Sequence, residues 1–157
     1  MSGVRGLPAT STYKALLAYH AGWAGEARVA FSWPEAAEKA TATAAIFAQR
    51  VASAGLPVEE WCFERFGVDA LGGPTVPPSS CEPPDVLLRA AWRCADARTA
   101  GLVGRELVPL TLSGPAAGMT GVGRGGSSPS ELLGIWPTLV DKTCVDPHVT
   151  VAMEPVS

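Results

Sequence analysis

The sequence predicts an α+β fold, specifically a two-layer sandwich with a ferredoxin-like βαββαβ core and extra strands. Two helices would cover one face of an antiparallel or mixed sheet. Segments with period-two alternation recur along the chain, and two longer segments have helical periodicity. A chain of 157 residues has the size of one domain. We therefore expect residues 1–12 to form a flexible leader and residues 13–157 a single α+β domain.

Two strands open the predicted domain. Residues 13–20 and 28–33 alternate in side-chain character, and the segment from Gly22 to Gly25 between them favours a hairpin turn. Ser32 and the glutamate three residues later match a capping box, so a helix is expected over residues 33–54. Its predicted buried stripe consists of Ala37, Thr41, Ala44, Ala48 and Val51, with Phe47 beside them.

The middle of the chain adds two more strands. In residues 58–67, alternation places Trp61 and Phe63 toward the core and Glu60 and Glu64 on the other face. Residues 86–95 fit either a helix or a strand, and Asp96 as the N-cap of a following helix favours the strand. Two basic residues of that strand are then candidate cross-strand partners of the glutamates, namely Arg89 and Arg93.

A second helix and two last strands complete the prediction. The helix should cover residues 97–110, and Pro109 should close or kink it. Strands are expected over 132–140, where Pro137 implies an edge or bulged strand, and over 148–153. The predicted buried residues of the helix are Ala100, Val103, Leu107 and Leu110.

Composition excludes several classes of protein. The net charge is −3, from 12 basic and 15 acidic residues, which is too balanced for a nucleic-acid or anionic-membrane binder. No apolar run approaches the ~20 residues of a membrane span. Four cysteines are too scattered for a zinc site, so we expect thiols in a cytosolic protein and no metal.

The letters G-x-G-x-x-G occur once, at Gly121, Gly123 and Gly126. A dinucleotide fingerprint needs a strand before the motif and a helix after it. Here a predicted helix precedes the motif and a predicted strand follows it. We therefore expect neither a dinucleotide site nor any other cofactor.

A weaker binding role for this Gly-rich loop rests on its backbone. Successive N–H groups around Gly121 and Gly123 could hold an anion, with the permanent charge of Arg124 beside them. Ser113 and Thr120 could add hydroxyl donors. The alternative is a mobile connection, or a loop that is ordered by a partner subunit.

Two further residues are candidates for a site. His20 follows the first predicted strand and could be a general base, or simply a histidine exposed at a hairpin. Asp69, in the loop after residues 58–67, could line a site, or form a turn at the strand exit.

Several stretches together resemble one known family. They are AYHAGWAGEARVAFSWPEAAEKA, ERFGVDALGGP, VLLRAAWRCADARTAGLVGRELVPL, LSGPAAGMTGVGRGG and ELLGIWPTLVDKTCVDPHV. Their order and spacing, over residues 13–151, resemble the C-terminal part of the main conserved domain of the acyclic terpene utilisation (AtuA-like) proteins.

The resemblance implies a role in bacterial breakdown of branched acyclic terpenoids such as citronellol or geraniol, through acyl-CoA intermediates. It supplies no catalytic residues. Family members carry a larger preceding α/β domain, so the resemblance implies a larger AtuA-like N-terminal domain or subunit as partner, and an oligomer. Two functions remain: a C-terminal domain or small subunit of an enzyme acting on a carboxylic acid or acyl-CoA, or a non-catalytic assembly module.

Overall fold

A computed structural model describes residues 3–75, 81–114, 119–121 and 128–152 of the chain. The chain divides into two compact units. The smaller unit comprises residues 1–19 and 133–157, and the larger unit comprises residues 20–132.

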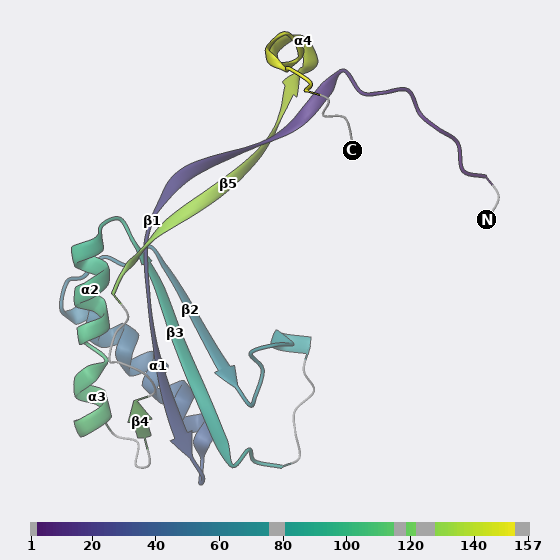
Figure 1. Cartoon of the computed structure of the whole chain (residues 1–157). Helices are drawn as coiled ribbons and strands as arrows, with labels where there is room; N and C mark the ends of the chain where they lie inside the picture. The colour runs from purple at the N-terminus through teal and green to yellow at the C-terminus, as the bar shows by residue number, and fades with distance from the viewer. Residues whose placement is uncertain (1–2, 76–80, 115–118, 122–127, 153–157) are drawn as a thin grey trace, which may run out of the picture. The chain divides into compact units, whose positions relative to one another are not determined.

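The larger unit is an α+β structure, as predicted. Its antiparallel sheet has the strand order β2-β3-β1-β4. Helices cover one face of this sheet, and the hydrophobic core lies between the two layers (Figure 1). The elements are β1 (Thr12–Ser32), α1 (Ala36–Ser53), β2 (Glu60–Phe66), β3 (Asp85–Cys94), α2 (Ala97–Arg105), α3 (Val108–Ser113) and β4 (Met119–Gly121).

The predicted hairpin between residues 13–20 and 28–33 is wrong, because β1 is one continuous strand. It pairs with β3 from Trp23 opposite Cys94 to Ser32 opposite Asp85. A Cβ atom on Gly22 would lie 2.7 Å from the carbonyl oxygen of Cys94. The glycines that suggested a turn therefore allow a close approach of the two strands instead.

The predicted capping box at the start of α1 is also wrong. The N-cap is Glu35, which has a φ of 62° and makes no capping hydrogen bond with its side chain. Glu82 caps the helix from the loop before β3: its Oε1 accepts hydrogen bonds from the backbone N–H of Glu35 and, at 3.3 Å, of Ala36. A carboxylate at this end is favourable because the N–H groups of the first turn have no partner within the helix.

The buried stripe of α1 is rotated by about one residue from the prediction. Phe47 fixes the rotation, since its ring packs edge-on against Trp61 at 5.3 Å and Trp92 at 5.8 Å between centroids. Thr41 is exposed, and the predicted alanines at 37, 44 and 48 are half-buried. The buried residues are Ala36, Ala40, Thr43, Phe47 and Val51.

The outward and inward faces of β2 and β3 follow the predicted alternation. Trp61 lies opposite Trp92 on the helix side and packs against the core. Phe63 shares that side but is 36% exposed, where it stacks on Trp61 with ring centroids 5.3 Å apart. Because β2 is an edge strand, the core does not extend over Phe63.

The predicted helix 97–110 is two helices, α2 and α3. Pro109 lies in the first turn of α3, where its missing N–H costs nothing. It begins the second helix rather than closing the first. Asp96 is the N-cap of α2, as predicted, and accepts a 2.8 Å hydrogen bond from the backbone N–H of Thr99. The four predicted core residues of this segment are buried: Ala100, Val103, Leu107 and Leu110.

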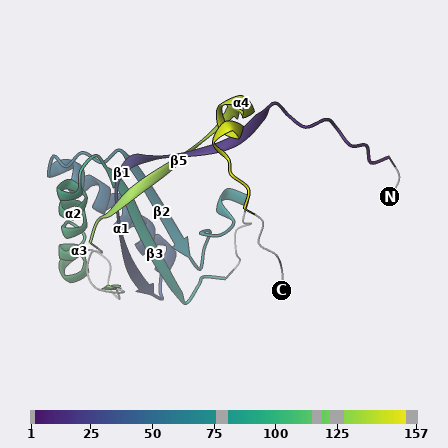
Figure 2. The same cartoon turned by 45° about the horizontal axis from the view of Figure 1, so that its top comes forward.

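The smaller unit is a two-stranded ribbon with a helical turn. The first part of β1 pairs with β5 (Ser130–Asp141), which confirms the predicted strand at 132–140. After β5 come α4 (Lys142–Val145) and the 3-10 turn Asp146–His148. Figure 2 shows β1 and β5 running side by side. The predicted strand at 148–153 is wrong, since residues 149–152 pair with no described strand.

Candidate functional site

The face of the sheet away from the helices carries a cluster of charged side chains. The register places Arg28 opposite Arg89 and Arg89 opposite Glu64, so these residues of β1, β3 and β2 form one row. Arg93 lies opposite Glu60 in a second row. We call this surface the open face. Its charged residues are Glu26, Arg28, Glu60, Glu64, Arg89 and Arg93, with Glu59 directly before β2.

Arg89 connects the two neighbouring strands through the open face. Its Nε donates to Oε2 of Glu26 at 2.8 Å, and one terminal nitrogen donates to Oε2 of Glu64 at 2.6 Å. Hydrogen bonds to Glu64 and then to Glu26 raise the pKa of the Arg89 guanidinium above its ordinary value. One guanidinium therefore links three adjacent strands of the sheet, β2, β3 and β1.

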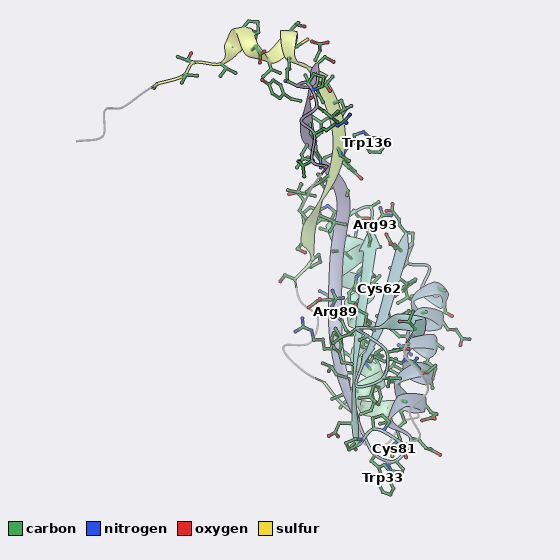
Figure 3. The ribbon with its side chains drawn as sticks, turned by 90° about the vertical axis from the view of Figure 1, so that its right-hand side faces the viewer. Trp33, Cys62, Cys81, Arg89, Arg93 and Trp136 are labelled. Carbon is green, nitrogen blue, oxygen red and sulfur yellow. The ribbon has the colours of Figure 1, made fainter. Side chains whose placement is uncertain are left out.

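Arg93, also on β3, likewise bonds to residues on both sides of its strand. It donates to Glu59 at 2.6 Å, to Glu60 at 3.2 Å and to the backbone oxygen of Ala21 at 3.3 Å. The predicted pairing of Arg89 and Arg93 with the glutamates of β2 is therefore confirmed. Figure 3 labels both arginines on β3, with Cys62 of β2 near them.

The chemistry of the open face follows from this pairing. Arg28 donates to Glu26 at 2.7 Å, so each of the three arginines is neutralised by a carboxylate. A phosphate would have to displace those carboxylates, which makes the surface a poor anion site. Paired carboxylates are equally poor general bases. The open face fits recognition of a polar protein surface better than catalysis.

Asp69 is held in a structural pair. Both of its carboxylate oxygens accept hydrogen bonds from Arg65, at 3.2 Å from Nε and more closely from a terminal nitrogen. Arg65 also donates to the hydroxyl of Thr41 on α1 at 2.8 Å. The hydrogen bond from Arg65 lowers the pKa of the Asp69 carboxyl below its usual 3.8. Asp69 therefore closes the turn after β2 against α1.

His20 lies near the middle of β1. Its Nε2 is 3.7 Å from Oε1 of Glu131, and its ring meets Trp23 edge-on at 6.2 Å between centroids. Both side chains of the His20–Glu131 pair are about half exposed. None of the other described candidate residues from the sequence lies beside it.

The Gly-rich segment begins on the sheet. Thr120 and Gly121 belong to β4, opposite Ala30 and Val29 of β1. Ser113 is the last residue of α3, which contacts β4. The two remaining candidates, Gly123 and Arg124, lie outside the described residues. The strand β4, directly before the motif, was not predicted, but the next described element after the segment is β5 rather than a helix, as predicted.

The sheet separates the sequence-predicted candidates from one another. Asp69 follows β2, and Gly121 ends β4, which are the two edges of a four-strand order. Three strand spacings of about 4.8 Å place these edges about 14 Å apart. His20 precedes Val29, the residue opposite Gly121, by nine residues, or about 30 Å of extended strand. Of the described candidate residues, only Ser113, Thr120 and Gly121 lie on elements that contact each other, namely α3 and β4.

Sequence reasoning missed Glu26 as a partner of Arg89. The expected turn at Gly22–Gly25 placed Glu26 outside the regular strand, so its alternation with Arg28 could not be used. A depression of about 430 Å³ was missed as well. It lies between the end of α1 and the start of the α2–α3 junction, where Arg50 donates to Glu106 at 2.8 Å, and it contains none of the predicted site residues.

A family model described as "Acyclic terpene utilisation family protein AtuA" matches residues 1–151. The chain belongs to the AtuA family. Neither a curated protein nor a solved structure matches it. Within the described ranges of this AtuA-family chain, no three metal-ligating side chains lie together, and no helix has the length and apolarity to cross a membrane.

Proposed function

We propose that this AtuA-family chain is the C-terminal domain or small subunit of an enzyme that acts on a carboxylic acid or acyl-CoA intermediate of acyclic terpenoid breakdown in the bacterial cytoplasm. A larger AtuA-like N-terminal domain or subunit would complete the site. The observation that carries the proposal is the family match over residues 1–151. The strand order β2-β3-β1-β4 supports a ferredoxin-like core as its scaffold.

The dispersal of the candidate residues supports a shared site rather than a complete one. The pairs that occupy Asp69, Arg89 and Arg93 leave them little capacity for a substrate. An active site needs several groups within hydrogen-bond reach of one reacting centre. A chain with this arrangement therefore contributes part of a site, and the partner contributes the rest.

The Gly-rich segment is the part that we assign to substrate binding. β4 holds Thr120 and Gly121 on the edge of a rigid sheet, so the residues that follow start from a fixed point. Backbone N–H groups after Gly121, with the charge of Arg124, would contact a carboxylate or a CoA phosphate.

Calorimetric titration of the chain, with and without the larger AtuA partner, tests this role. We expect Arg124→Ala to weaken binding of a branched acyl-CoA at least tenfold in the complex, and Arg105→Ala, an exposed arginine on α2, to leave it unchanged. Free CoA and the free acid as titrants distinguish a phosphate contact from a carboxylate contact. Unchanged binding by the Arg124 variant removes the loop from the site, and full activity of the isolated chain overturns the shared-site proposal.

A second function, a non-catalytic assembly module, is favoured by the open face. Its paired charges alternate with small or apolar residues such as Ala91 and Cys62, and the helices of the larger unit lie on the other face of the sheet (Figure 1). Ala91→Arg, in the middle of the open face, should then abolish co-purification with the larger partner. Ala45→Arg, on the exposed side of α1, is the matched control. Retained co-purification together with lost turnover would favour the enzymatic role.

A further inference from the structure

We draw no further inference here: the strongest candidate, the exposed apolar surface of the ribbon that β1 and β5 form in the smaller unit, carries no proposal because nothing in the described part of the chain shows what covers it.

Discussion

Gly25 of β1 lies directly opposite Trp92 of β3, and the Trp92 indole occupies the space that a side chain at residue 25 would need. A Cβ atom on Gly25 would come within 2.5 Å of the ring. The ring itself is fixed: Nε1 donates to the oxygen of Ala100 at 2.9 Å, and the side chain is 3% exposed. The glycine therefore allows β1 and α2 to hold the same tryptophan.

Gly25→Ala should consequently destabilise the larger unit by about 1–3 kcal/mol, because the indole cannot move without losing its hydrogen bond. Urea unfolding followed by tryptophan fluorescence measures this effect. Gly6→Ala is the control, since a Cβ atom on Gly6 meets nothing within 4 Å. Equal unfolding midpoints for the two variants would contradict the close packing.

Arg89→Met should destabilise the fold more than Arg28→Met does. Arg89 bonds two carboxylates with a side chain that is 29% exposed, whereas Arg28 bonds one with a side chain that is 50% exposed. Each partly exposed pair contributes no more than about 1 kcal/mol after screening by solvent. A double-mutant cycle of Arg89→Met with Glu64→Gln, repeated at high salt, measures the coupling. A coupling free energy near zero at low salt would show that the Arg89–Glu64 pair does not stabilise the folded state.

The stability of the chain should fall in acid partly through Asp69. Because Arg65 lowers the pKa of this carboxyl below 3.8, the pair stabilises the folded state above the unfolded pKa. That contribution is lost as the pH falls through the folded pKa. Asp69→Asn should be less stable than the wild type near neutral pH, and the difference should shrink below about pH 4. Urea midpoints of both proteins across this range provide the test, and a constant difference would be inconsistent with it.

Cys94 should be the slowest of the four thiols to alkylate. It is 0% exposed, and burial raises the pKa of its thiol, so little thiolate forms near neutral pH. Cys62, Cys81 and Cys144 are exposed. Peptide mass spectrometry after a short iodoacetamide pulse should find the three exposed thiols labelled and Cys94 intact until denaturant is added. Rapid labelling of Cys94 would mean that the sheet opens far more often than its packing implies.

The sequence by itself determined the α+β class, the inward face of β3, the N-cap Asp96, the buried residues of α2 and α3, and the family. These features depend on local signals: alternation along one strand, a capping side chain, and apolar spacing along a helix. The pairing of Arg89 and Arg93 with β2 also followed from alternation, since opposite charges on adjacent strands meet when the register allows it.

Tertiary structure decided the rest. Gly22 and Gly25 have the local signature of a turn, but their role is set by Cys94 and Trp92, about 70 residues further along the chain. Glu82 caps α1 from 46 residues away, which no local pattern could indicate. The separation of Asp69 from Gly121 likewise depends on strand order. In each case a long-range contact overrode a short-range preference, because a single close approach or capping bond contributes more than the weak propensity of one residue.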